Sequence, residues 1–366
     1  MYGTVHRAVW ESELIRTCAG RAFSLALVLA LAPLAGGSVQ ATAQLGTARV
    51  AAHPVIEDRY PAPETRFDGG VVGRADIAYA TFRGFRPLTL DLYLPPRSRA
   101  PESGYPLVVF VHGGAWMSGH ARHAGAFEDF PGVLASLARR GYVVASLNYR
   151  LSGEAAFPAA LMDVKIALRW LRARSAAFSA DPERVIIWGA SAGGQLAGLA
   201  ALACEEADLD PARTGALAAA GSDELVGQSD CVQGAVLWYS PTDFLSMADQ
   251  AAHSAPEAPD ARYLGCAIPA CAARTLALAS PISFADAGDP PVLLIHGVRD
   301  EVVPFAQSAE LEARLLGAGG RVELLALEDV GHSFVGATHE QTRRATLLAL
   351  ERTVAFIDAA TRPSPQ

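Results

Sequence analysis

A serine flanked by glycines lies in the middle of the segment VIIWGASAGGQL, residues 185–196. The apolar residues 185–188 are rich in β-branched side chains and predict a buried strand, whereas residues 194–202 are rich in Ala and Leu and predict a helix. Between them, Gly189-Ala190-Ser191-Ala192-Gly193 fits the G-x-S-x-G pattern of a sharp turn that exposes a nucleophilic serine. The segment therefore predicts Ser191 as a nucleophile, although the motif alone also fits a glycine-rich turn with a bystander serine.

A serine nucleophile needs a base and an acid that orients this base. Asp300 ends the motif HGVRD after the apolar run 292–295, and His332 in DVGHSF follows the run 322–327. Both residues would lie at the carboxyl ends of parallel strands, where ligands bind in open α/β sheets. The chain order Ser191, Asp300, His332 is also the order that a strand–turn–helix serine motif requires. We therefore predict these three residues as catalytic.

Other polar residues compete for these roles. Asp243 in SPTDF follows the apolar run 232–239 and stays open as an alternative acid. His120 and His123 have a spacing that suggests a metal, but no acidic or cysteine partner is spaced to complete a site, so a polar loop is expected. Three further residues are expected to have no catalytic role, namely Asp329 (too close in sequence to brace His332), Asp289 (before its strand) and His296 (packed at the end of one).

Attack on a carbonyl group requires backbone N–H donors that stabilise the oxyanion. Gly113 and Gly114 in HGGAW follow the apolar run 107–111, and two successive glycines allow the backbone to turn its N–H groups toward a carbonyl oxygen beside Ser191. Together with the N–H group of Ala192, these amides are predicted to form an oxyanion hole.

Strand-like and helix-like segments alternate along the chain. Strands are predicted at 77–82, 88–94, 107–112, 142–147, 185–188, 232–239, 292–295 and 322–327, and helices at 131–140, 158–172, 194–202, about 305–317 and 339–359. This alternation predicts an α/β fold with a mostly parallel central sheet and helices on both faces.

Two longer segments, 203–230 and 246–280, interrupt the alternation and could cover the site as a small lid. Both contain proline, so neither supplies the continuous amphipathic helix of an interfacial lipase lid. A small, fixed pocket is expected instead, with Trp116 and Tyr239 as flat apolar surfaces that bind substrate.

The composition favours a folded domain with a sizeable core. Of the 366 residues, 51% are hydrophobic and 19% are charged, and the formal net charge is −8. A negatively charged chain without a Lys/Arg run or a phosphate-binding loop argues against nucleic acid as a partner.

The first 43 residues resemble a secretory signal peptide. Arg16 and Arg21 precede the apolar run 22–34, which leads to the A-x-A pattern at 41–43. The apolar run is short for a membrane span, so no stable span is expected after the leader is removed; a buried N-terminal helix is the alternative. The expected layout is a signal peptide at 1–43, a linker at 44–70, a catalytic domain at 71–360 and a disordered tail at 361–366, in an exported protein.

Four cysteines follow this leader, and an oxidising compartment favours their pairing. Cys204 would end the helix after the serine turn and Cys231 would precede the next strand, so these two could approach each other. Cys266 and Cys271 could close a small loop. Three pairings are possible, and free buried thiols are the alternative.

The ordered set HGGAW, NYR (148–150), GASAGG, SPTDF, HGVRDEVVP and GHSF resembles the α/β-hydrolase superfamily over about residues 70–360. More narrowly, it is similar to the bacterial esterase/lipase group that includes hormone-sensitive-lipase-like and feruloyl-esterase-like members. The resemblance implies an α/β-hydrolase fold and a carboxylic ester hydrolase that uses no cofactor and no metal. It also implies that His112 supports the oxyanion loop and that Arg150 pairs with Asp163 under the site.

The expected activity is hydrolysis of short-acyl or aryl-acyl esters through an acyl-enzyme, with a small-molecule ester as the partner. An aryl formamidase, a serine peptidase and a non-catalytic binding module are alternatives on the same fold. A peptidase would be expected to carry an extra β-rich domain, and a binding module would be expected to have lost one of the three predicted catalytic residues.

Overall fold

The computed structural model describes residues 64–362, apart from residue 205 and residues 251–256. The expected signal peptide at 1–43 and most of the expected linker lie outside these residues. The sheet begins earlier than residue 71, because strand β1 (Glu64–Arg66) pairs with strand β2 (Val72–Ala80). At the other end, Thr361, which was expected in the tail, donates its hydroxyl to the carbonyl oxygen of Ile357 (2.7 Å) and so belongs to the folded domain.

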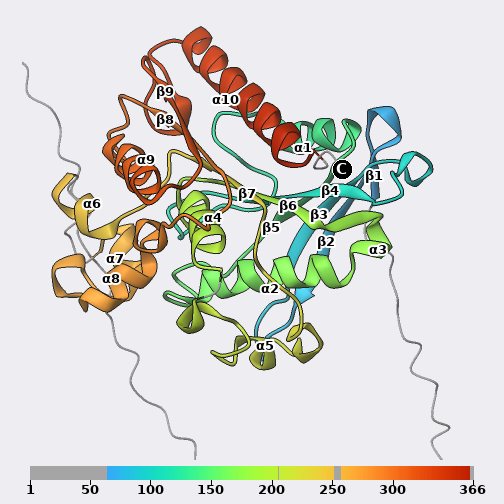
Figure 1. The fold of residues 1–366 in the computed structure, drawn as a ribbon, viewed down its shortest axis with the longest axis horizontal. Coiled ribbons are helices and arrows are strands. Elements are labelled where there is room, and N and C mark those ends of the chain that lie inside the picture. Colours follow the sequence, from blue (N-terminus) through green and yellow to red (C-terminus); the bar gives the residue numbers. More distant parts are fainter. Residues whose placement is uncertain (1–63, 205, 251–256, 363–366) are drawn as a thin grey trace, which may run out of the picture. The chain divides into compact units, whose positions relative to one another are not determined.

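Nine strands of the described region form one sheet in the order β1-β2-β3-β5-β4-β6-β7-β8-β9 (Figure 1). Strands β4 to β9 run parallel to one another, and β1, β2 and β3 add an antiparallel edge. The mostly parallel sheet is therefore confirmed. The remaining strands are β3 (Leu88–Leu94), β4 (Tyr105–Val111), β5 (Val143–Leu147), β6 (Ala180–Ala190), β7 (Gly234–Trp238), β8 (Val292–Gly297) and β9 (Val322–Leu327).

Helices cover both faces of this sheet. Successive residues of a strand point to opposite faces, so a continuous apolar strand feeds two cores. In β4, Val108 and Phe110 pack in the core that also contains residues of α1 (Phe130–Arg139) and α10 (His339–Ala360). Val109, from the same strand, packs in the other core.

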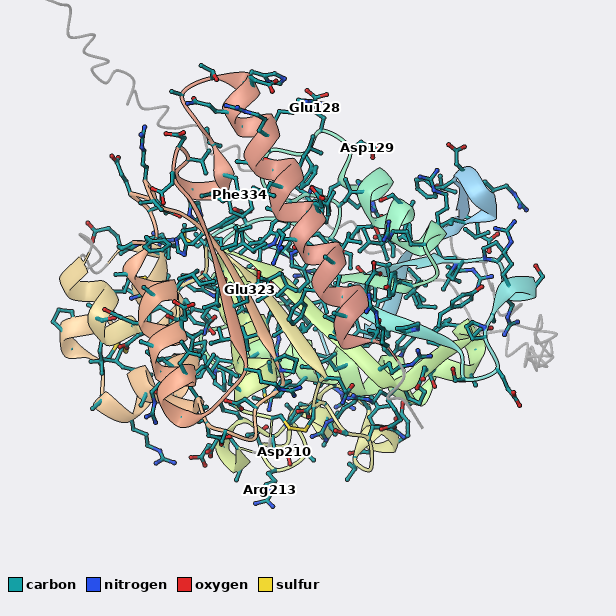
Figure 2. The ribbon with its side chains drawn as sticks, turned by 45° about the horizontal axis from the view of Figure 1, so that its top comes forward. Glu128, Asp129, Asp210, Arg213, Glu323 and Phe334 are labelled. Atoms are coloured by element: carbon teal, nitrogen blue, oxygen red, sulfur yellow. A yellow bond between two sulfur atoms is a disulfide. The ribbon has the colours of Figure 1, made fainter. Side chains whose placement is uncertain are left out.

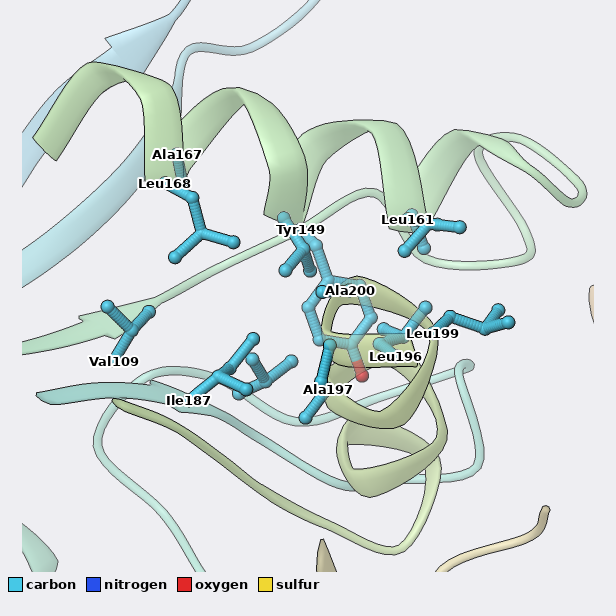
Figure 3. Close-up of a cluster of buried hydrophobic side chains, with 14 of the residues drawn as sticks. Val109, Tyr149, Leu161, Ala167, Leu168, Ile187, Leu196, Ala197, Leu199 and Ala200 are labelled. Atoms are coloured by element: carbon cyan, nitrogen blue, oxygen red, sulfur yellow. The ribbon is translucent and has the colours of Figure 1, made fainter. Parts of the chain in front are cut away.

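That second core contains residues of α2 (Ala159–Ala173), α4 (Ala192–Leu202) and α9 (Ala306–Ala318). In Figure 3, Leu161 of α2 lies above Leu196 of α4, and Leu168 of α2 lies above Val109 and Ile187 of the sheet. Helix α4 is buried along its whole length, which explains its run of small and apolar residues. This burial fixes the position of the first turn of α4, which follows Ser191 directly.

The segment 203–230 packs under α2 and not over the predicted site. It contains α5 (Ala216–Ala219), and the buried Lys165 and Arg169 of α2 pair with Asp230 (3.3 and 2.6 Å). Burial lowers the pKa of Lys165, and the Asp230 carboxylate opposes this effect. In Figure 2, Asp210 of this segment lies near the lower margin of the molecule, whereas Phe334, which follows β9, lies in its upper half.

The segment 246–280 forms short helices that pack into the second core. Helices α6 (Phe244–Gln250), α7 (Pro259–Leu264) and α8 (Ala273–Ala279) each have seven residues or fewer. Phe244, Tyr263 and Leu276 are buried. The described residues of this segment agree with the expectation of no continuous amphipathic helix, because Pro259 begins α7 and Pro269 lies in the short turn that follows it.

Both expected disulfides are present. Cys204 pairs with Cys231 at the two ends of the segment under α2, and Cys266 pairs with Cys271 inside the second segment. No helix among the described residues is long and apolar enough to cross a membrane. The short helix α3 (Ser175–Phe178) completes the α-helices of the described chain.

Candidate active site

Ser191 occupies the sharp turn between β6 and α4. Its backbone has φ 54° and ψ −125°, a conformation that is strained for a residue with a side chain and that is typical of functional turns. The Ser191 N–H group donates to the carbonyl oxygen of Trp238 in β7 (2.8 Å). At Gly193, an added Cβ would lie 2.2 Å from the carbonyl oxygen of Val111, so only glycine lets the turn pack against the end of β4.

The structure brings together the three residues that were predicted as catalytic. Nε2 of His332 lies 3.0 Å from Oγ of Ser191, and Nδ1 of His332 lies 2.8 Å from Oδ2 of Asp300. Asp300 follows β8, and His332 begins the short 3₁₀ turn η7 (His332–Phe334) after β9. Strands β6, β8 and β9 of the parallel sheet therefore deliver all three side chains to the edge formed by the carboxyl ends of the strands.

The carboxylate of Asp300 is buried but strongly hydrogen-bonded. Its Oδ1 accepts hydrogen bonds from the N–H groups of Val302 (2.9 Å) and Val303 (2.8 Å). Burial alone would raise the pKa of Asp300, but the hydrogen bonds from His296 and His332 outweigh burial and hold this pKa below its usual range. Asp300 is consequently ionised at neutral pH and suited to stabilise a positive charge on His332.

The structure does not bring the alternative acids to His332. Oδ1 of Asp243 accepts the N–H group of Leu245 (2.9 Å) at the start of α6. Asp329 pairs with Arg299 at the surface (3.0 Å). Asp289 precedes β8 at the other edge of the sheet, as expected.

The loop after β4 approaches Ser191 closely. An added Cβ on Gly113 would lie 2.8 Å from the carbonyl oxygen of Ala190 and 3.3 Å from Cβ of Ser191. The N–H groups of Met117 and Ser118 both donate to the carbonyl oxygen of Gly114 (3.0 Å each), which closes the loop into a tight turn. Ala192 directly follows Ser191 and begins α4, so the three predicted oxyanion donors surround the serine turn.

His112 is a buried support for this loop, as the family resemblance implies. Its imidazole stacks on Tyr149 (ring centroids 4.3 Å apart), and its Nδ1 lies 2.7 Å from the carbonyl oxygen of Gly113. The Tyr149 hydroxyl donates to the carbonyl oxygen of His112 (2.9 Å). Burial lowers the pKa of His112 to about 4, so its imidazole is neutral at pH 7 and Nδ1–H can donate to the Gly113 carbonyl.

Arg150 and Asp163 form the expected ion pair. Nη2 of Arg150 lies 2.6 Å from Oδ1 of Asp163, and the Arg150 N–H group donates to Oδ2 (2.8 Å). The Asp163 side chain on α2 is fully buried, and this pair therefore ties the loop after β5 to α2.

A cavity of about 590 Å³ opens at Ser191 and His332. Tyr239 lines it, and the Tyr239 ring meets the His332 ring edge-on, with centroids 4.8 Å apart. The residues that line the cavity are Gly113, Gly114, Ala115, Met117, Ser118, Gly119, His120, His123, Ala124, Gly125, Ala190, Ser191, Tyr239, Val302, His332 and Ser333.

Trp116 is not among these residues. Its ring stacks on Tyr263 (4.5 Å), and its indole N–H donates to Oε1 of Gln195 on α4 (3.0 Å). A buried hydrogen-bond partner thus holds this side chain in the core. The described residues of 203–230 and 246–280 are also absent from the cavity lining, so these parts of the two segments do not cover the site as a lid.

Sequence reasoning did not assign several residues that the structure places at the site. His120 and His123, expected only as a polar loop, line the cavity together with Met117. His296, expected only to pack, lies 3.2 Å from Oδ2 of Asp300. The sequence held one sign of this contact, because His296 begins the motif HGVRD that Asp300 ends.

This strand order, with a strained serine turn after a central strand and partners after the last two strands, defines the α/β-hydrolase fold. Solved structures share it. A truncated carbohydrate esterase from gut microbiota has a TM-score of 0.64 at 24% identity and covers 83% of this chain and 99% of its own. Est2 of Thermogutta terrifontis with butyrate bound has a TM-score of 0.60 at 22% identity, over 83% of this chain and 96% of its own. At these identities the likeness concerns the fold alone.

The BD-FAE family model matches residues 90–315, and the chain belongs to this family. Esterase LipQ of Mycobacterium tuberculosis is 30% identical over 279 residues, which are 75% of this chain and 59% of LipQ. Esterase LipC of the same organism is 33% identical over 246 residues, which are 65% of this chain and 55% of LipC. The chain thus spans little more than half of the length of these two relatives, and the predicted membership of an α/β-hydrolase esterase group is confirmed.

Proposed function

We propose that this protein is a serine carboxylic ester hydrolase that forms an acyl-enzyme on Ser191. The observation that carries the proposal is the position of His332, 3.0 Å from Oγ of Ser191 and 2.8 Å from the carboxylate of Asp300. These contacts form the chain of nucleophile, base and orienting acid that acyl transfer needs. The names of relatives such as LipQ and LipC agree with this activity.

The mechanism divides ester hydrolysis into two steps. His332 takes the proton of the Ser191 hydroxyl while Oγ attacks the ester carbonyl carbon, and Asp300 stabilises the imidazolium that forms. The N–H groups of Gly113, Gly114 and Ala192 hold the oxyanion. The alcohol leaves with a proton from His332. Water, deprotonated by the same histidine, then attacks the acyl-enzyme and releases the acid.

We further propose that the preferred substrates carry short-acyl or aryl-acyl groups. A cavity of about 590 Å³ is suited to a small ligand. The short, proline-interrupted helices of 246–280 offer no broad apolar surface for a lipid interface. Tyr239 supplies an aromatic wall next to His332. The structures of Est2 with butyrate or propionate bound are consistent with small acyl groups on this fold.

The proposal of acyl preference is tested by kcat/KM for acetyl, butyryl, decanoyl and feruloyl esters below their micellar concentrations, with an aryl formamide in the same panel. Each buried methylene contributes only about 0.8 kcal/mol, so kcat/KM should change gradually from acetyl to butyryl and be lower for decanoyl. A maximum at decanoyl, or a jump in rate above the micellar concentration, would contradict a small fixed pocket. A maximum for the formamide would favour a formamidase.

We also propose that the protein is exported through the predicted signal peptide. The Cys204–Cys231 and Cys266–Cys271 bonds support this proposal, because structural disulfides form mainly in oxidising compartments.

A further inference from the structure

A second histidine contacts the carboxylate that orients His332. His296 lies in β8, four residues before Asp300, and the side chains of both residues are fully buried. Nε2 of His296 lies 3.2 Å from Oδ2 of Asp300, the same oxygen that lies 2.8 Å from Nδ1 of His332. One carboxylate oxygen is therefore shared by two imidazoles.

The surroundings of His296 determine where its proton lies. Nε2 is also 2.9 Å from the carbonyl oxygen of Val303. Carbonyl and carboxylate oxygens only accept, so Nε2 carries a proton that faces both of them. Nδ1 lies 2.7 Å from Oγ of Ser308 on α9, whose hydroxyl can donate to it. The Phe305 ring packs edge-to-face with the His296 imidazole (ring centroids 5.8 Å apart) and limits rotation of this imidazole.

We propose that His296 is a positioning residue of the catalytic unit, which holds Oδ2 of Asp300 in line with His332 and withdraws negative charge from this oxygen. The inference rests on the proposed ester hydrolysis at Ser191, because His296 acts on the reaction only through Asp300 and His332. It adds a fourth side chain to the chain Ser191–His332–Asp300.

The electrostatics of the pair support this role. Burial raises the pKa of Asp300, and the hydrogen bond from His296 opposes burial together with the hydrogen bond and the charge of His332. The titratable groups that face the pair are His332 on η7 and Tyr239 after β7, whose phenol interacts with the Asp300 charge. Arg299 directs its charge to Asp329 at the surface.

Two substitutions separate positioning from packing. In His296→Asn the shorter amide takes the place of Nδ1, near Ser308, and cannot reach Asp300. In His296→Gln the longer side chain brings its amide N–H to the place of Nε2 and keeps the donor. Both variants lose the imidazole ring, but only His296→Gln keeps a donor to Asp300.

In His296→Asn we expect kcat to fall on the order of 10-fold or more with KM nearly unchanged, since the affected contact serves the transition state. Asp300, with one donor fewer, should stabilise protonated His332 more strongly, which raises the pKa of the base. The acidic limb of the kcat/KM profile should then move up by roughly half a pH unit. His296→Gln should largely restore kcat and leave the limb in place.

Rates are expressed per active site, titrated with a fluorophosphonate, so that partial unfolding does not count as lost catalysis. If His296→Asn does not fold, Ser308→Ala takes its place, because loss of the Nδ1 contact frees the ring and should shift the limb in the same direction by less. Wild-type kcat per site with an unmoved limb in the variant that folds would overturn the inference. Full activity of Ser191→Ala would instead overturn the proposed function, so the two failures are distinguishable.

Discussion

Asp300 and Asp243 both follow parallel strands, yet they differ in what surrounds them. The Asp300 carboxylate is buried between two N–H groups of its own loop and two imidazoles, whereas Asp243 accepts a hydrogen bond from Leu245 in its own turn. At the scale of single residues, this contrast decides which carboxylate can act on His332.

Asp300→Asn should therefore lower kcat on the order of 10³-fold or more, because the amide no longer fixes the tautomer of His332 or stabilises its positive charge. Asp243→Asn, the matched control, should change kcat by less than about threefold, since Asp243 accepts a hydrogen bond from the Leu245 N–H group in its own turn and an asparagine side-chain oxygen can accept the same bond. The measurement is steady-state hydrolysis of an acetyl ester, with circular dichroism to verify folding. A large loss in Asp243→Asn with a small loss in Asp300→Asn would reverse the assignment.

The ionisation of Asp300 also links the site to pH. Its pKa is held below the value of an unfolded chain, so its contribution to stability is present above the unfolded pKa and is lost as pH falls through the folded pKa. The stability that ionised Asp300 contributes to the fold should therefore be lost in acid and kept in base.

At the scale of elements, the two disulfides close loops of very different length. Cys204 and Cys231 are 27 residues apart in the chain, whereas Cys266 and Cys271 are five apart. A cross-link restricts the unfolded chain more when the closed loop is longer. The bond that holds the segment under α2 should therefore contribute more to stability.

Replacing Cys204 and Cys231 together by Ala should lower the free energy of unfolding by about 3–4 kcal/mol, and replacing Cys266 and Cys271 together by about 2 kcal/mol. Denaturant unfolding of the two double variants beside the wild type measures both values. Equal losses, or a larger loss in the short loop, would show that loop length does not govern the effect.

The sequence predicted most of the elements because its strands are continuous apolar runs bounded by glycine, proline and polar residues. The predicted strand at 88–94 coincides with β3, and the run 322–327 coincides with β9. The catalytic candidates could be placed because they follow such runs directly. Periodicity does not reveal which side chains meet across the fold, so the contact of His296 with Asp300 and the inward position of Trp116 were missed.

The segment 203–230 illustrates the same limit. Its location under α2 depends on the buried cations Lys165 and Arg169, which pair with Asp230, a residue that lies far away in sequence. A single Lys or Arg within a helical pattern usually faces solvent, so the sequence did not indicate that Lys165 and Arg169 form a buried ion-pair network. The long insertion consequently looked as much like a lid as like a support for the sheet.

At the scale of the whole molecule, carboxyl groups at the two ends of the parallel strands make stability depend on pH in opposite ways. Asp300 lies at the carboxyl ends of the strands, and Asp289 lies at their amino ends. Asp289 lies before β8, at the edge remote from Ser191, and burial raises its pKa to about 6, although the Asp286 N–H group opposes this. A carboxyl whose pKa is raised on folding contributes its full stability below the unfolded pKa and loses it as pH rises through about 6.

Asp289→Asn should consequently raise the free energy of unfolding at pH 8 by about 1–2 kcal/mol and leave it nearly unchanged at pH 4, because the amide mimics the neutral acid. Thermal unfolding at the two pH values provides the measurement, with the exposed Asp329→Asn as the control. A gain at pH 4 that disappears at pH 8 would give the opposite sign and contradict the assignment.

Covalent labelling tests the proposed mechanism most directly. A serine-directed fluorophosphonate should modify Ser191 and no other residue, as located by tandem mass spectrometry of the digested protein, and ester hydrolysis should be lost in proportion to labelling. Ser191→Ala and His332→Ala should each lower kcat on the order of 10³-fold or more, and the double variant should be little worse than either, because the two side chains act as a unit. Undiminished ester hydrolysis by Ser191→Ala, or inactivation by a label on another residue, would contradict the role of Ser191 as nucleophile.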